Sequence, residues 1–215
     1  MPQLILEEFR GRPATAIVSL GRSCATAYNV RRHYNFGSAF PFDWWWAPES
    51  AMPRVLERLD ADYIYDPAML ELTEGNGSVR HRELRILLHH EFPRDHAAPG
   101  GPVRGNFLDH LATPKRRTAY LIAKFRALDA PGARILTVTS EDRVGGYGVP
   151  LARLFGQAEY AIVATGEVGQ INVPDWRGDP RLWDDKLAAL GVSFERGAQP
   201  VFAETTAQHT DRDLR

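Results

Sequence analysis

Cys24 is the residue of this 215-residue chain that is best suited to covalent chemistry. It follows the apolar run Ala16 to Leu20 and Gly21, and apolar residues with helical spacing continue from it to Tyr34. A strand that turns sharply into a helix presents this position to unpaired backbone N–H groups and the positive end of the helix dipole. Both favour a thiolate and would stabilise an oxyanion. The alternative is a packing role, because cysteine is small, apolar and often buried.

A nucleophilic cysteine needs a base, and the adjacent pair His89 and His90 is the best placed of the seven histidines. The pair follows Ile86, Leu87 and Leu88 in a segment, 84–92, that we expect to be a strand or the end of one. Neighbouring side chains of a strand point to opposite faces, so only one of the two imidazoles can reach the thiol. A surface histidine pair is the alternative, and no histidine–carboxylate spacing indicates a metal site.

Asp43 lies in a strongly aromatic segment, Phe40 to Trp46. A carboxylate between two aromatic residues is costly to bury alone and therefore needs a partner. That partner is either a histidine oriented for catalysis, as in a triad, or an arginine or set of backbone amides that hold the loop. Trp44 and Trp45 are expected in the core and in a pocket wall, with a sugar-stacking platform as the alternative.

Further substrate contacts are predicted around the thiol and the imidazole. We expect them from Arg22, Ser23, Trp44, Trp45 and His89. Ser23 is also a typical residue for capping the helix that begins at Cys24.

The elements that must position these residues alternate between strands and helices. Strands are expected at 16–20, 133–139 and 160–164, and helices at 24–34, 48–59, 114–128, 149–156 and 183–190, with a turn at 74–77 and a loop at 94–105. This order predicts the α/β class, with a mostly parallel central sheet and helices on both faces. We expect a single domain over 1–205 and a polar tail, 206–215, that is disordered.

Composition excludes several classes of function. A net charge of −1 gives no reason to expect a nucleic acid or membrane partner. A lone cysteine rules out an internal disulfide and a thiolate-rich metal site. No signal peptide or apolar span is seen, and a P-loop and a dinucleotide fingerprint are both missing, so we expect a cytoplasmic protein without a cofactor. Its expected partner is a small molecule or a peptide substrate.

Two stretches, Ser19–Ala27 and Pro41–Trp44, resemble the signature of a bacterial family described as papain-like cysteine peptidases. The family pattern is S-L-G-x-x-C-x-x-A, then P-F-D-W, then a histidine in an H-[DE]-F-like motif. His90, Glu91 and Phe92 fit the third motif, which is why we favour His90 over His89. The resemblance covers roughly residues 16 to 140. It implies Cys24 as nucleophile, His90 as base and Asp43 as an orienting residue.

Three functions follow as hypotheses. The first is a cysteine-dependent hydrolase, peptidase-like, or an acyl transferase. The second is a sugar- or anionic-metabolite-binding protein or transferase, in which the aromatic segment lines the pocket and Cys24 only packs. The third is a scaffold that uses the P-F-D-W segment as an interaction surface.

Overall fold

A computed structural model describes residues 6–48, 51–95, 101–166 and 176–195. Three parallel strands, β1 (Ala16–Ser19), β4 (Arg134–Thr139) and β5 (Glu159–Ala164), form one sheet in the order β1-β4-β5. Their register pairs Ile17 with Leu136 and Leu136 with Ala161. The α/β class and the parallel arrangement are thus confirmed, although the sheet within the described residues is smaller than the central sheet we expected.

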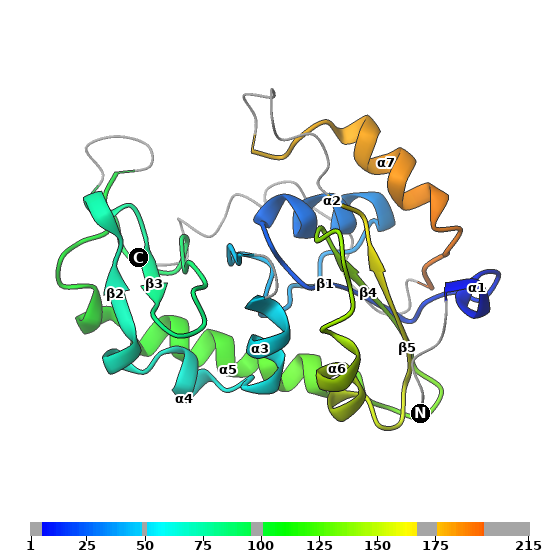
Figure 1. The fold of residues 1–215 in the computed structure, drawn as a ribbon, viewed down its shortest axis with the longest axis horizontal. Helices are drawn as coiled ribbons and strands as arrows, with labels where there is room; N and C mark the ends of the chain where they lie inside the picture. The colour runs from blue at the N-terminus through cyan, green and yellow to red at the C-terminus, as the bar shows by residue number, and fades with distance from the viewer. Residues whose placement is uncertain (1–5, 49–50, 96–100, 167–175, 196–215) are drawn as a thin grey trace.

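Helices follow or precede these strands in the predicted order (Figure 1). The longer ones are α2 (Cys24–Tyr34), α5 (Ala112–Arg126) and α7 (Pro180–Ala189); the shorter ones are α1 (Leu6–Phe9), α3 (Ala51–Glu57), α4 (Ala61–Ile64) and α6 (Gly148–Leu154). Three 3-10 turns complete them: η1 (Pro67–Met69), η2 (Glu74–Asn76) and η3 (Phe107–His110). The expected helix 48–59 is thus shorter, and its positions 49–50 lie outside the described residues.

The predicted turn at 74–77 joins an antiparallel hairpin of β2 (Leu70–Leu72) and β3 (Val79–His81). The strand expected at 84–92 is wrong. Leu87 makes only isolated bridges, to Trp46 and to Arg80. Arg85 has a left-handed φ of 61°, which an extended strand cannot contain, so the run turns instead of pairing along its length.

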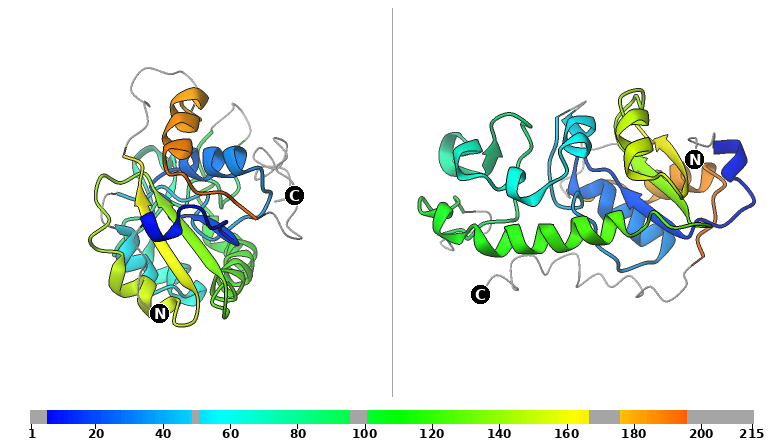
Figure 2. Two further views of the ribbon diagram at one scale, coloured as in Figure 1. Left: turned by 90° about the vertical axis from the view of Figure 1, so that its right-hand side faces the viewer. Right: turned by 90° about the horizontal axis from the view of Figure 1, so that it is seen from below.

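Helix α5 links the two ends of the molecule. It starts beside the hairpin region and α4, and it ends close to the sheet (Figures 1 and 2). Phe125, in its last turn, packs edge-on against Phe40, Phe42 and Phe155, with ring centroids 5.2 to 6.3 Å apart. The aromatic segment around Phe42 is therefore built into the core, as its composition predicted.

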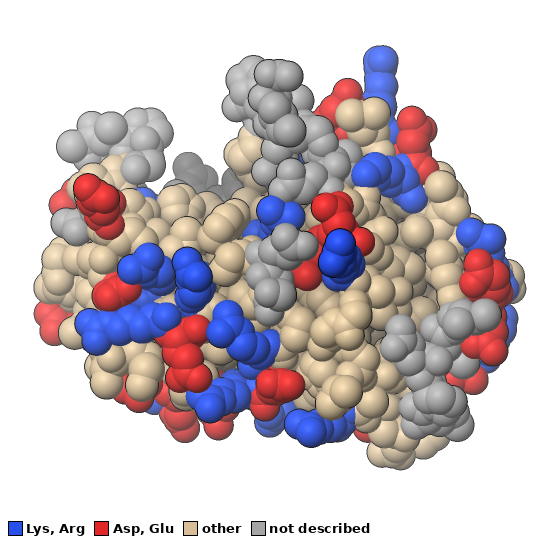
Figure 3. All heavy atoms as spheres, viewed as in Figure 1, with Lys and Arg blue, Asp and Glu red and all other residues tan. Residues whose placement is uncertain are grey.

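The hairpin end carries a mixed-charge surface. Figure 3 shows basic and acidic side chains interleaved over this part of the face. Arg80 and Arg82 both pair with Glu71, at 2.5 and 3.1 Å, and Arg58 pairs with Glu83 at 2.7 Å. All these groups are at least a quarter exposed, so each pair adds little to stability. No helix among the described residues is long and apolar enough to span a bilayer.

The single domain over 1–205 stays a prediction. One continuous hydrophobic core includes Val18 of β1, Val79 of the hairpin and Trp183 of α7. The polar tail, 206–215, lies outside the described residues.

His81, at the end of β3, should make the stability of the hairpin depend on pH. It is fully buried, its Nδ1 accepts from the Leu84 amide at 3.1 Å, and its Nε2 lies 3.3 Å from the Tyr63 carbonyl. Burial lowers the pKa of His81 below its usual value, so this histidine stabilises the fold above about pH 6.5, and the contribution is lost as pH falls. Protonation at Nδ1 breaks the Leu84 hydrogen bond, which costs about 1 kcal/mol.

Urea unfolding at about pH 7.5 and about pH 5 checks this prediction. The wild type should lose more stability on acidification than His81→Gln. The exposed His89 supplies the control, because His89→Gln should keep the wild-type pH dependence. Equal pH dependence in all three proteins would contradict the assignment to His81.

Candidate functional site

Cys24 is the first residue of α2 and directly follows the turn that leaves β1. Gly21 and Arg22 both have left-handed backbone, with φ of 83° and 69°, and Ser23 is extended. Glycine adopts such a φ freely, whereas at Arg22 it costs about 1 kcal/mol. A Cβ at Gly21 would also lie 3.5 Å from Met52 Sδ. This tight turn places Cys24 at the carboxyl end of β1, where ligands of parallel sheets bind.

Cys24 is partly buried against a small aromatic cluster. It packs against Tyr28, one turn further along α2, and Trp44, from the loop before α3. This burial raises the pKa of the Cys24 thiol to about 11, while hydrogen bonds from the backbone amides of Cys24 and Ala25 lower it by less. The expected thiolate is therefore wrong for the free protein. The amides act in the expected direction, but the loss of hydration outweighs them.

The two candidate bases lie edge-on to each other, with ring centroids 4.8 Å apart, and their other neighbours differ. The His90 ring lies against Trp44, with centroids 5.9 Å apart and planes at 77°. His89 is exposed, and Arg94 donates to its Nδ1 at 3.2 Å and to its carbonyl oxygen at 2.6 Å. Cys24 thus packs against the cluster of Tyr28 and Trp44, and His90 contacts one member of this cluster, whereas His89 is bound by Arg94.

Asp43 is buried beside a cation. Its Oδ2 lies 3.6 Å from Arg31 Nη1 and accepts a hydrogen bond from the Phe40 amide at 3.0 Å. Burial raises the pKa of Asp43 to about 6, and the charges of Arg31 and Lys124 and the Phe40 amide oppose that rise. Of the two partners that the sequence allowed, the arginine with a backbone amide is the one these contacts support. Asp43 therefore holds the aromatic loop together, and its role in orienting His90 stays a prediction.

Glu91 is a buried carboxylate to which the sequence analysis assigned no role. It accepts a hydrogen bond from Trp45 Nε1 at 3.2 Å, and its pKa is raised by burial and lowered by Arg117 to a smaller extent. Trp45 itself is fully buried. Its indole therefore supports the loop from inside the core, and direct contact with a substrate is not open to it in this structure. Only the position of Glu91 next to His90 in the third motif could have drawn attention to it.

Polar side chains also gather at the carboxyl end of β4. Ser140 and Glu141 directly follow the strand and are buried. Thr26, two residues after Cys24, donates to Ser140 Oγ at 3.0 Å. Glu141 interacts with Tyr147, whose pKa is raised chiefly by burial and further by this carboxylate. Since β1 and β4 are parallel neighbours, these groups border the Cys24 turn. In the sequence, Ser140 and Glu141 could have been recognised as a polar pair that directly follows an apolar strand.

Arg22 and Ser23, two predicted substrate contacts, lie beside Cys24 and are partly exposed. The Ser23 side chain makes no capping hydrogen bond to α2, so the capping explanation is wrong; its carbonyl accepts from the Thr26 amide at 3.2 Å. The Arg22 carbonyl accepts from the Ala47 amide at 3.2 Å. Their contact with a substrate stays a prediction, as it does for Trp44 and His89.

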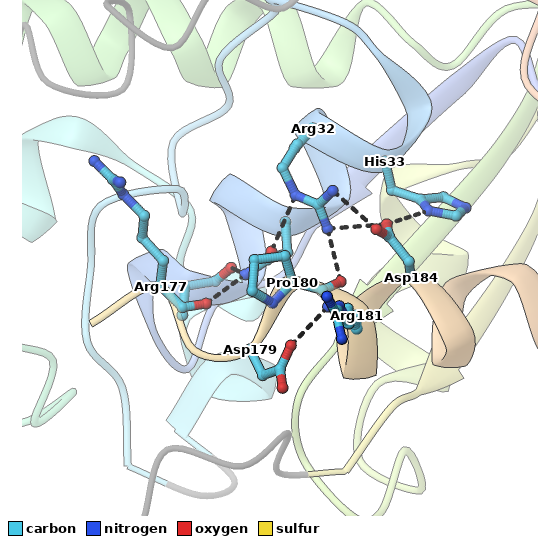
Figure 4. A network of polar contacts seen from close by, with 9 residues as sticks. Arg32, His33, Arg177, Asp179, Pro180, Arg181 and Asp184 are labelled. Atoms are coloured by element: carbon cyan, nitrogen blue, oxygen red, sulfur yellow. Dashed lines mark hydrogen bonds and ion pairs between the residues drawn. The ribbon is translucent and has the colours of Figure 1, made fainter. Parts of the chain in front are cut away.

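A polar network fixes the start of α7 against α2 (Figure 4). Arg32 makes two hydrogen bonds to Asp184, at 2.9 and 3.0 Å, and a third to the Pro180 carbonyl at 3.0 Å. His33 Nδ1 lies 2.8 Å from the same carboxylate. Bidentate arginine–carboxylate pairs are geometrically specific, so this network holds the two helices in one register.

Neither a metal site nor the groove described here involves Cys24. Within the described ranges, no group of three or more His, Cys, Asp and Glu residues could hold a metal ion. A groove of about 460 Å³ lies between α4 and α5, with Asp60, Lys115 and Arg126 among its lining residues. Its lining shares no residue with the predicted site, and Lys115 pairs with Asp62 across it at 2.6 Å.

No family model, curated protein or solved structure matches this chain. The relation to papain-like cysteine peptidases therefore rests on the residues of the sequence alone.

Proposed function

We propose that Cys24 is the nucleophile of a thiol-dependent hydrolase or acyl transferase and that His90 is its base. The observation that carries the proposal is the position of the thiol. It stands at the start of α2 and at the carboxyl end of a parallel strand, with two backbone amides directed at its sulfur. His90 contacts Trp44, a member of the two-residue cluster against which Cys24 packs.

The proposed reaction has two steps. His90 takes the proton from Cys24, and the sulfur attacks the carbonyl carbon of the substrate while the amides at the start of α2 stabilise the oxyanion. The imidazolium returns the proton to the leaving group as the acyl–sulfur intermediate forms. Water, or an acceptor in a transferase, then releases the acyl group. A small-molecule or peptide carbonyl compound is the substrate class, and a free thiol suits a reducing compartment such as the cytoplasm.

The raised pKa of Cys24 makes the base essential to this proposal. A thiol with a pKa of about 11 is ionised in about one molecule in 10,000 at pH 7. Reaction at neutral pH therefore needs proton transfer during the attack, as general base catalysis provides. Apo sites often hold nucleophile and base further apart than the working complex does, so the Trp44 contact is an acceptable starting geometry.

One observation favours a second candidate function. A neutral thiol between two aromatic rings is also what a packed, unreactive cysteine looks like. The surface around Cys24 would then bind a sugar or an anionic metabolite without cysteine chemistry, with Trp44 and Arg22 as its contacts.

The pH dependence of iodoacetamide alkylation separates the two candidates. Because the chain has one cysteine, the mass shift reports Cys24 alone. We expect the wild type to react about tenfold faster than His90→Ala at pH 7, since removal of the base leaves only the small thiolate fraction. His89→Ala is the matched control and should react at the wild-type rate.

The second candidate predicts a different result. All three proteins would then react at one rate, about 300-fold below that of free cysteine at pH 7, and that rate would rise with pH toward 11. This outcome would overturn the proposed thiol chemistry.

A further inference from the structure

The aromatic loop and the segment that carries the two candidate bases contact each other at several points. The amides of Trp46 and Leu87 donate to each other's carbonyls, at 3.1 and 2.7 Å. Further along, the His90 ring lies edge-on to that of Trp44. Leu87 makes only isolated bridges, and residues 89 to 92 lie in turns and bends. Side chains must therefore align His90 with the loop.

Glu91, the residue after His90, supplies such a side chain. It is buried, and its Oε1 accepts a hydrogen bond from the indole N–H of Trp45 at 3.2 Å. Burial raises the pKa of Glu91, while the charge of Arg117 and hydrogen bonds from Trp45 and Tyr65 lower it to a smaller extent. These partners come from the aromatic loop, the end of α4 and α5. A buried carboxylate is costly unless such partners hold it, so its position is closely specified.

We infer that Glu91 is a positioning residue, which holds the His90 ring in place against Trp44 by binding the indole N–H of Trp45. The inference rests on the proposed role of His90 as the base for Cys24. Neighbouring residues of the loop bind neighbouring residues of the other segment, so a shift of Glu91 moves His90 as well. A misplacement of about 1 Å in a catalytic group can cost about 100-fold in rate.

The variants Glu91→Gln and Glu91→Asp separate the geometry of this contact from its charge. Glutamine keeps the length and an oxygen acceptor for Trp45, whereas aspartate keeps the charge and is one methylene shorter. We expect acylation by 4-nitrophenyl acetate at pH 7 to slow about tenfold in Glu91→Asp and to stay within about twofold of the wild type in Glu91→Gln. An equal loss in both variants would overturn the geometric role.

Glu83→Asp is the matched control for the shortened side chain. Glu83 also accepts from an arginine and from a tyrosine hydroxyl, those of Arg58 and Tyr63, but it is exposed and lies beside the hairpin. Its substitution should leave the acylation rate at the wild-type value, because no contact joins it to the aromatic loop.

Proton NMR signals of the histidine rings report the position of His90 without any reaction. The ring current of Trp44 shifts the signals of the His90 ring, and their loss in His90→Gln assigns them. We expect this shift to move toward that of an exposed histidine in Glu91→Asp and to be retained in Glu91→Gln. Trp45→Phe, which keeps a ring but removes the donor, should move it in the same direction as Glu91→Asp. Unchanged signals of the buried His81 would show that the fold is intact.

A double-mutant comparison tests whether Glu91 acts through His90. In the His90→Ala background, Glu91→Asp should slow acylation by less than about twofold, because the group that it positions is gone. A tenfold loss in both backgrounds would overturn the inference, since Glu91 would then support the site as a whole. His90 signals that Glu91→Asp and Trp45→Phe leave unchanged would overturn it as well.

A failure of the inference is distinct from a failure of the proposed function. If His90→Ala leaves the acylation rate unchanged, the proposed thiol chemistry is wrong, while the NMR signals still show whether Glu91 holds the His90 ring. If His90→Ala slows the reaction and Glu91→Asp does not, His90 remains the base and Glu91 has no part in its position.

Discussion

Phe125→Ala is expected to lower the free energy of unfolding by about 3 to 5 kcal/mol, the usual cost of removing a buried phenyl ring. Phe125 is fully buried in the last turn of α5. Its ring meets those of Phe42 and Phe155 at 5.2 and 5.3 Å, and these contacts join the aromatic loop, α5 and α6. The cavity that the removed phenyl ring leaves cannot close easily, because each neighbouring ring is itself held by other core residues.

The same helix supplies the control for this substitution. Tyr120 is 69% exposed, so Tyr120→Ala should change the free energy of unfolding by about 0.5 kcal/mol or less. Phe125→Leu keeps most of the apolar volume and should cost less than Phe125→Ala. Urea unfolding at pH 7 measures all three. A loss for Phe125→Ala no larger than that for Tyr120→Ala would contradict the role of the aromatic cluster in the core.

This cluster also explains how the protein positions its site. Phe42 packs on Phe125 and on Trp45, the latter at 5.9 Å, and the next residues are Asp43 and Trp44. The core therefore fixes the loop that encloses Cys24. The segment thus serves both the core and the candidate site, since Trp44 contacts His90 and belongs to the cluster against which Cys24 packs.

Local patterns predicted most of the elements, because strands and helices depend on residues close in the chain. The turn from β1 into α2 is the clearest case: an apolar run, a glycine and a helical spacing together located Cys24 at the helix start. The segment 84–92 marks the limit of this approach. Leu84, Ile86 and Leu88 are buried and alternate with more exposed residues, as in a strand. The left-handed backbone at Arg85 nevertheless interrupts the segment, so that it makes isolated bridges and no continuous strand pairing. The alternation of buried and exposed residues does not reveal such a turn in the backbone.

The chemistry of the site depends on contacts that are distant in the sequence. The helix N-terminus that favours a thiolate is a local feature, whereas burial raises the pKa of Cys24, and the cluster against which it packs includes Trp44, twenty positions away. Arg31, the cation beside Asp43, belongs to α2, and the Arg177 carbonyl reaches Asn29 of the same helix from the loop before α7. Sequence patterns predicted that a carboxylate at position 43 needs a partner, but they could not select which one.

His90→Ala is expected to slow acylation of Cys24 by 4-nitrophenyl acetate at pH 7 by about 100-fold, the usual contribution of a general base. The structure gives a physical reason to choose His90 over its neighbour. His90 contacts Trp44, a member of the cluster against which Cys24 packs, while Arg94 holds His89 by its Nδ1 and its carbonyl.

His89→Ala should therefore acylate at close to the wild-type rate, and Cys24→Ala should not acylate at all. The acyl mass shift, followed over time, measures the reaction directly on the one cysteine. If His89→Ala shows the larger loss, the base has been assigned to the wrong histidine, and the family resemblance loses its third motif. If neither variant slows the reaction, the thiol acts without a histidine, and the buried, neutral Cys24 is better explained by packing against Tyr28 and Trp44.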